Sequence, residues 1–166
     1  MSFGKITTCL WFEDQGEAAA NHYVSAFAPD SKILSIQRYT PSGQDTHGQE
    51  PGRVMAVEFE LRGRSFVALN GGPAKWKFSE AMSLMIDCKD QDEVDHFWEK
   101  LTEDGDVSRQ QCGWLADKFG VSWQVVPTAL KNMMASEDKA AAGRATQAMM
   151  KMKKFDIAEL EKAFKG

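Results

Sequence analysis

The sequence carries the same short acidic pattern twice, each time between an apolar strand-like run and an amphipathic helix. The pattern is D-Q-G-E at residues 14–17 and D-Q-D-E at residues 90–93. An Asp followed three residues later by a Glu is typical of a helix start, because the Asp carboxylate accepts a free backbone N–H and the Glu reaches back to the cap residue. The repeat predicts helices over residues 16–27 and 91–103.

Strand-like runs surround the two helices in the same order. They are rich in β-branched and aromatic residues and are bounded by Gly, Pro and polar turn residues. They cover residues 6–12, 31–39, 53–61 and 65–70 in the first half, and 82–88, 107–111, 113–117 and 121–127 in the second. The polar stretch 41–52 predicts a mobile loop. Each half therefore predicts a βαβββ module, and the whole predicts an α+β fold with modules of about 1–73 and 74–127.

The remainder, residues 128–166, is rich in Ala, Met and Lys and predicts a helical C-terminal extension. Asp156 followed by Glu159 predicts another capped helix, over residues 157–164. The methionines of this region follow helical spacing, which favours packing of the extension onto the domain or onto a dimer partner. A promiscuous Met-rich binding face is the alternative interpretation.

The net charge and the cysteines indicate which classes of partner and which compartment to expect. The net charge of −4 and the absence of a Lys/Arg stripe argue against nucleic-acid binding. Cys9, Cys88 and Cys112 show no C-x-x-C spacing, which is typical of reduced, mostly buried thiols in a cytoplasmic protein. No apolar run is long enough to span a bilayer, and the N-terminus does not resemble a signal peptide. We expect a cytoplasmic protein with no nucleic-acid and no membrane partner.

The stretch C-G-W-L-A-D-K-F-G-V-S-W-Q-V-V-P at residues 112–127 predicts a hairpin with a tight D-K-F-G turn. In its second strand, alternation places Ser122, Gln124 and Val126 on one face and Trp123 on the other. We interpret Gln124 as a polar contact point in a cavity wall. Trp123 is better explained as a core residue packed against a helix.

Several segments resemble one known family. They are A-L-N-G-G-P at 68–73, S-L-M-I-D-C at 83–88, E-V-D-H-F-W-E-K-L at 93–101, the hairpin at 112–127 and M-K-M-K-K-F-D-I-A-E-L at 150–160. They are similar to the PhnB-like family, also called demethylubiquinone methyltransferase-like, of the vicinal oxygen chelate superfamily. That superfamily includes glyoxalase I, bleomycin resistance proteins and dioxygenases. The resemblance implies a cupped mixed sheet with a small-molecule ligand on its concave side, and a homodimer.

The resemblance also locates the positions that hold a divalent metal elsewhere in the superfamily. They fall on Thr7 (or Thr8), Ala68, Ser83 and Gln124. None of these side chains is a His or a carboxylate, the donors that divalent metals prefer. We therefore expect no metal. We also expect no cofactor, because the Gly-rich strand-to-helix turn of a nucleotide-type methyl donor site is missing.

The predicted site is a ligand pocket in the cup. Its expected lining is Thr7, Cys9, Trp11, Phe66, Asn70, Phe78, Ser83, Trp114 and Gln124. Aromatic area with a few amide and hydroxyl groups is the usual make-up of a small-molecule site. No nucleophile with a His partner is identifiable, and a buried, inert thiol is expected for Cys9. One alternative is a metal-dependent lyase, isomerase or dioxygenase with a non-standard metal site. Another is a homodimer that acts mainly through its Met-rich tail. The family label would also imply a methyltransferase, which the missing Gly-rich turn argues against.

Overall fold

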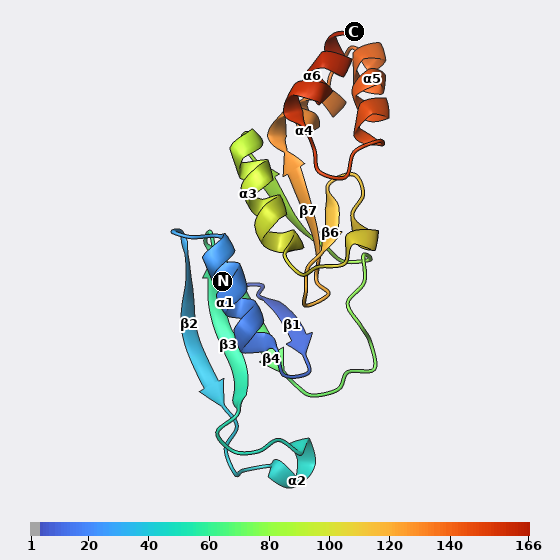
Figure 1. The fold of residues 1–166 in the computed structure, drawn as a ribbon. Coiled ribbons are helices and arrows are strands. Elements are labelled where there is room, and N and C mark those ends of the chain that lie inside the picture. Colours follow the sequence, from blue (N-terminus) through green and yellow to red (C-terminus); the bar gives the residue numbers. More distant parts are fainter. Residues whose placement is uncertain (1–3) are drawn as a thin grey trace. The chain divides into compact units, whose positions relative to one another are not determined.

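The computed structural model describes residues 4–166. The chain forms two compact units, one up to Lys77 and the other from Phe78 onward (Figure 1). Each unit contains one small mixed sheet with a helix on one face, and the second also carries the three C-terminal helices. No helix within the described residues is both long and apolar enough to cross a membrane.

The first unit is a four-stranded sheet covered by one helix. The strands lie in the order β1 (Thr8–Phe12), β4 (Arg64–Asn70), β3 (Val54–Leu61) and β2 (Ser31–Arg38), and the helix is α1 (Gly16–Ala26). The β1–β4 pair is parallel and the other two pairs are antiparallel. Because successive side chains point to opposite faces of a strand, alternate residues are buried beneath α1.

Aromatic rings fill the space between α1 and the first sheet. Tyr23 of α1 lies 6.2 Å from Phe59 of β3, measured between ring centroids. Phe59 in turn stacks on Phe66 of β4, with 5.3 Å between centroids. All three are buried, so the unit has a core of its own.

The second unit has a three-stranded sheet in the order β5 (Leu84–Cys88), β7 (Ser122–Pro127) and β6 (Trp114–Ala116). Helix α3 (Gln91–Thr102) covers one face and buries Phe97 and Leu101 there. We call the face of each sheet that its helix does not cover the open face.

Residues 107–111 do not form the predicted strand. Val107–Arg109 is a single 3-10 turn, η1. The Asp106 carboxylate accepts hydrogen bonds from the backbone N–H and the hydroxyl of Ser108, at 2.9 and 2.6 Å. Such a local Asp–Ser turn competes with strand pairing, and the second unit therefore has one strand fewer than predicted.

Two of the three predicted helix caps are confirmed. Asp90 accepts a hydrogen bond from the Glu93 backbone N–H at the start of α3, at 2.9 Å. Asp156 does the same for Glu159 at the start of α6 (Ile157–Lys165). The cap predicted from residues 14–17 is wrong, because α1 begins after Gln15, whose side chain makes no capping bond.

The side chain of Asn70 caps α1 from outside the helix. Its Oδ1 accepts the backbone N–H of Gly16 at 2.7 Å, and its Nδ2 donates to the carbonyl of Val54 at 3.1 Å. A side chain at residue 16 would not fit, since a Cβ there would lie 2.7 Å from the same Oδ1. This buried amide therefore joins α1, β3 and β4.

Replacing Asn70 by Ala is expected to lower the free energy of unfolding by roughly 1–3 kcal/mol, because both partner groups lose their hydrogen bond in a buried place. Urea denaturation followed by far-ultraviolet circular dichroism measures this change. Asn70→Asp keeps the acceptor for Gly16 and should lose less. Equal stability of Asn70→Ala and the natural protein would contradict the structural role.

The polar stretch 41–52, predicted as a loop, contains one helical turn, α2 (Gln44–His47). Its His47 ring lies 4.7 Å from the Tyr39 ring, between centroids, and accepts a hydrogen bond from the Gln49 backbone N–H. Tyr39 donates its hydroxyl to the carbonyl of Asn70 at 2.7 Å. The stretch is therefore tied to the first sheet by side-chain contacts.

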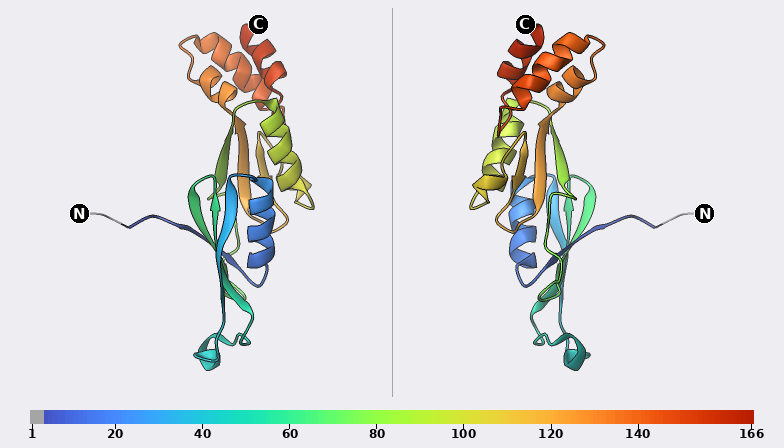
Figure 2. Two further views of the ribbon diagram at one scale, coloured as in Figure 1. Left: turned by 90° about the vertical axis from the view of Figure 1, so that its left-hand side faces the viewer. Right: turned by 90° about the vertical axis from the view of Figure 1, so that its right-hand side faces the viewer.

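Three helices complete the second unit: α4 (Thr128–Met134), α5 (Lys139–Met149) and α6. Figure 2 shows them gathered at one end of the second sheet, beyond the end of β7. They enclose a small core of their own, made of Leu130, Met133, Ala145, Phe155 and Leu160. Cys112 and Val126 of the sheet region pack against this core, so the extension contacts its own chain.

Candidate functional site

The open face of the second sheet brings together three of the predicted site residues. Strand pairing places Trp114 of β6 opposite Gln124 of β7. The Gln124 side chain donates a hydrogen bond to the hydroxyl of Ser83, which precedes β5, at 2.8 Å. These three predicted site residues therefore lie on one face of the second sheet. All three are partly exposed, so the face offers amide, hydroxyl and indole groups to a ligand.

Trp123 lies on the opposite face, as predicted, with 2% of its surface exposed. Its indole Nε1–H donates to Asp117 Oδ2 at 2.8 Å. The other carboxylate oxygen of Asp117 accepts the backbone N–H groups of Phe119 and Val121 in the hairpin turn. The Asp117 carboxylate therefore connects the hairpin turn to the buried side chain of Trp123.

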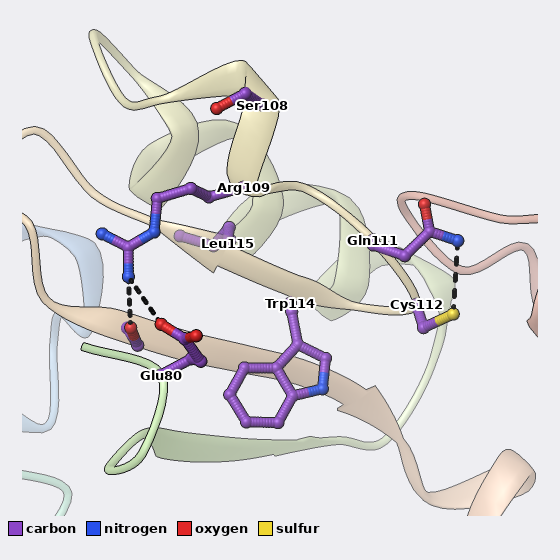
Figure 3. Close-up of a pocket in the computed structure, with 8 residues that line it drawn as sticks. Glu80, Ser108, Arg109, Gln111, Cys112, Trp114 and Leu115 are labelled. Carbon is purple, nitrogen blue, oxygen red and sulfur yellow. Dashed lines mark hydrogen bonds and ion pairs between the residues drawn. The ribbon is translucent and has the colours of Figure 1, made fainter.

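A pocket of about 490 Å³ lies beside Trp114, in the second unit (Figure 3). Its lining comes from η1 and the residues after it, from β6, from the start of β7 and from the segment before β5. The lining residues are Glu80, Ser108, Arg109, Gln111, Cys112, Trp114, Leu115 and Ser122. Small-molecule sites commonly have volumes of roughly 300–1,000 Å³, so the pocket is large enough for an organic ligand.

Arg109 brings a positive charge to the pocket. It donates a hydrogen bond to the Ser122 hydroxyl at 3.0 Å, and its guanidinium lies 3.9 Å from a carboxylate oxygen of Glu80. Figure 3 shows the Arg109 side chain extended toward Glu80. Ser122 lies two residues before Gln124 on β7 and therefore shares a sheet face with Gln124 and with Trp114, which is opposite Gln124. Ser108 hydrogen bonds hold the pKa of nearby Asp106 below its usual value.

Residues 111–113, which we call the pocket wall, are held by the C-terminal segment. The backbone N–H groups of Cys112 and Gly113 donate to the carbonyls of Met152 and Lys153, both at 2.8 Å. The Gln111 side chain donates to the carbonyl of Met150 at 3.0 Å. The segment between α5 and α6 therefore positions one side of the pocket.

Trp114 is the predicted site residue that lines this pocket; the sequence did not point to the other seven as ligand contacts. Arg109 and Ser108 lie in the segment predicted as a strand, and the approach of Arg109 to Ser122 depends on the η1 turn. The D-x-S pattern at residues 106–108, a local turn signal, could have indicated that turn. No comparable signal marks Glu80.

In the first unit the predicted residues divide between two faces of the sheet. Cys9 and Trp11 lie on the open face, where the alternation of β1 places them, and Thr7 lies exposed just before the strand. Phe66 and Asn70 are buried on the α1 side. The sequence interpretation that all five share a face is wrong, because β1 and β4 pair with Thr8 opposite Phe66.

The neighbouring metal position, Ala68, lies on the α1 side as well, fully buried opposite Leu10. Trp11 remains 45% exposed and donates its indole N–H to the carbonyl of Gly72 at 2.9 Å. Its ring lies against Gly71, where a Cβ would approach to 2.1 Å. The glycine pair therefore accommodates a tryptophan.

The expectation of mostly buried cysteines is wrong for Cys9, which is exposed, and for Cys112, which is half-buried; Cys88 is buried. Partial desolvation nevertheless raises the pKa of the Cys9 thiol above its usual value. Since the thiolate is the nucleophile, a raised pKa lowers its reactivity at neutral pH.

Phe78, another predicted pocket residue, lies in the segment before β5, near Gly120 of the hairpin turn.

The donors at the superfamily's metal positions do not fit a divalent ion. In the second unit they are a neutral amide and a neutral hydroxyl, Gln124 and Ser83, hydrogen-bonded to each other. The carboxylate of Asp87 on the same face forms an ion pair with Lys131 of α4. Among residues 4–166, no three His, Cys, Asp or Glu side chains gather closely enough to hold a metal.

The chain is similar to proteins of known structure. A PhnB protein from Bacillus cereus is 35% identical over 75% of this chain and 100% of its own length, with a TM-score of 0.65. A protein from Pseudomonas aeruginosa is 17% identical over 75% of this chain and 98% of its own, with a TM-score of 0.58. The second likeness supports the fold alone. No protein of curated function matches the chain significantly.

The α+β class, the mixed strand pairing and the C-terminal helices predicted from the sequence are confirmed, and the strands form two small sheets. The sequence profile of the family described as 3-demethylubiquinone-9 3-methyltransferase matches residues 4–126, which excludes the three C-terminal helices. With the profile match and the 35% identity to a PhnB protein, the chain belongs to the PhnB-like family of the vicinal oxygen chelate superfamily.

Proposed function

We propose that this protein binds a small organic molecule on the open face of its second unit, without the divalent metal that its superfamily commonly uses. The observation that carries the proposal is the pocket of about 490 Å³ beside Trp114. It combines an indole ring with a few polar groups that can orient a ligand, Arg109 and Ser122 among them. That combination is the usual composition of a small-molecule site.

The site chemistry supports binding more than the reaction in the family's description. Methyl transfer from a nucleotide-type donor needs a Gly-rich turn between a strand and a helix. The connections from β1 to α1 and from β5 to α3 are E-D-Q and K-D, without glycine. The neutral pair Gln124 and Ser83 offers little to a divalent ion. The homodimer and the cytoplasmic location stay predictions.

Native mass spectrometry of untagged protein, purified without a chelator, tests the proposal. We expect chains that carry an added organic mass and no stoichiometric divalent ion. One divalent ion per chain would overturn the metal-free assignment and favour a metal-dependent enzyme. The same spectrum reports whether two chains associate.

Gln124→Ala is expected to reduce the fraction of chains that retain the organic mass, because the amide lies on the open face beside Trp114. The cost in stability should be about 1 kcal/mol, the value of one partly buried hydrogen bond. The matched control is Gln147→Ala, which removes an exposed amide of α5 that does not line the pocket. Unchanged retention in Gln124→Ala would remove Gln124 from the site.

A further inference from the structure

The Arg109 guanidinium is held by a hydrogen bond and remains partly exposed. Its side chain is 31% exposed, and one guanidinium nitrogen donates to the hydroxyl of Ser122, which is buried on β7. A guanidinium has five N–H donors in a fixed planar fork and no acceptor. The bond to Ser122 therefore orients the fork in the pocket and leaves donors for a ligand.

The carboxylates near Arg109 offset its positive charge only weakly. The Glu80 carboxylate is 3.9 Å away on a side chain that is 80% exposed. Exposed ion pairs of this kind contribute little. The Asp106 carboxylate is engaged by Ser108 at the start of η1. A ligand oxyanion in bidentate contact would approach to roughly 2.7–2.9 Å, a stronger interaction than the pair with Glu80.

The other side of the pocket is apolar. Trp114 and Leu115 both line the pocket (Figure 3). Trp114 shares its sheet face with Ser122, the hydrogen-bond partner of Arg109. An indole ring offers a broad flat surface to aromatic or other planar groups. A ligand that satisfies both sides therefore has a charged end and a flat apolar body.

We propose that the pocket binds an organic oxyanion, a carboxylate or phosphate attached to a flat apolar group, with Arg109 and Ser122 on the oxyanion and Trp114 on the apolar body. This inference rests on the proposed function, since it names the ligand class of the same pocket. Arg109 is then the main residue that recognises the charge of the ligand. Glu80 competes with the ligand for the Arg109 guanidinium.

Three probes of the same shape test the inference: 2-naphthoate, 2-naphthyl phosphate and the neutral 2-naphthamide. Each is titrated into labelled protein, and the dissociation constant is taken from the nitrogen–proton NMR shifts of the Trp114 indole and the Arg109 side chain. At least one anion should bind about tenfold or more tightly than the amide, as a charge-assisted contact provides. The two anions distinguish carboxylate from phosphate.

Two variants give opposite expectations. Arg109→Gln should remove the preference for the anion, and Glu80→Gln should strengthen anion binding several-fold because the competing carboxylate is gone. Glu80 is exposed, so its variant keeps the test valid even if Arg109→Gln fails to fold. Equal binding of anion and amide, unchanged in both variants, would overturn the oxyanion assignment while leaving a small-molecule pocket. No shift at Trp114 with any probe would overturn both.

Discussion

Replacing Trp123 by Ala is expected to lower the free energy of unfolding by roughly 3–5 kcal/mol, the usual cost of truncating a fully buried aromatic residue. Trp123 is 2% exposed and lies on the face of β7 that packs on α3. Its loss also deprives Asp117 of the indole N–H bound at 2.8 Å. A buried carboxylate oxygen without its donor adds its own desolvation cost.

The change is measured by urea denaturation followed by far-ultraviolet circular dichroism, since the fluorescence itself depends on tryptophan. Trp76→Ala is the matched control, because Trp76 is 86% exposed and its truncation should change stability by about 0.5 kcal/mol or less. Trp123→Phe separates the two contributions, as it keeps most of the apolar volume and loses the bond to Asp117. A Trp123→Ala protein as stable as the Trp76 control would show that this core assignment is wrong.

The hairpin shows why sequence patterns succeeded in the second unit. Its strands alternate with period two, and D-K-F-G needs a glycine at its end, where Gly120 has a φ of 86°. Both signals are local, so they determine which face Trp123 and Gln124 occupy. The caps at Asp90 and Asp156 are local signals of the same kind.

The failures concern contacts between distant segments. Whether Asn70 faces α1 or the open side depends on how β4 pairs with β1, and a shift of one residue reverses every face. That register is set by α1 packing on both strands, which no short pattern records. Arg109 reaches Ser122 only because residues 107–109 turn. The pocket thus combines a predictable strand face with a turn that the sequence interpretation missed.

Gly113→Ala is expected to destabilise the second unit by roughly 2–5 kcal/mol, combining a left-handed backbone with overpacking. Gly113 has a φ of 78°, and a Cβ there would lie 2.3 Å from the Phe155 ring and 2.9 Å from the Val125 carbonyl. Denaturation in urea measures the total. Gly52→Ala is the control for backbone strain alone, since Gly52 has a φ of 90° with nothing within 4 Å of the added Cβ.

The difference between the destabilisation caused by Gly113→Ala and that caused by Gly52→Ala measures how tightly the C-terminal helices are packed against the pocket wall. Phe155 belongs to the core of those helices, so it cannot yield to a Cβ at residue 113 without disturbing them. A smaller side chain should relieve the contact, and Phe155→Leu combined with Gly113→Ala is expected to recover part of the loss. If the double variant is merely additive, the clash with Phe155 does not determine the cost. Recovery would instead show that residues beyond the family match at 4–126 support the wall of the candidate binding site.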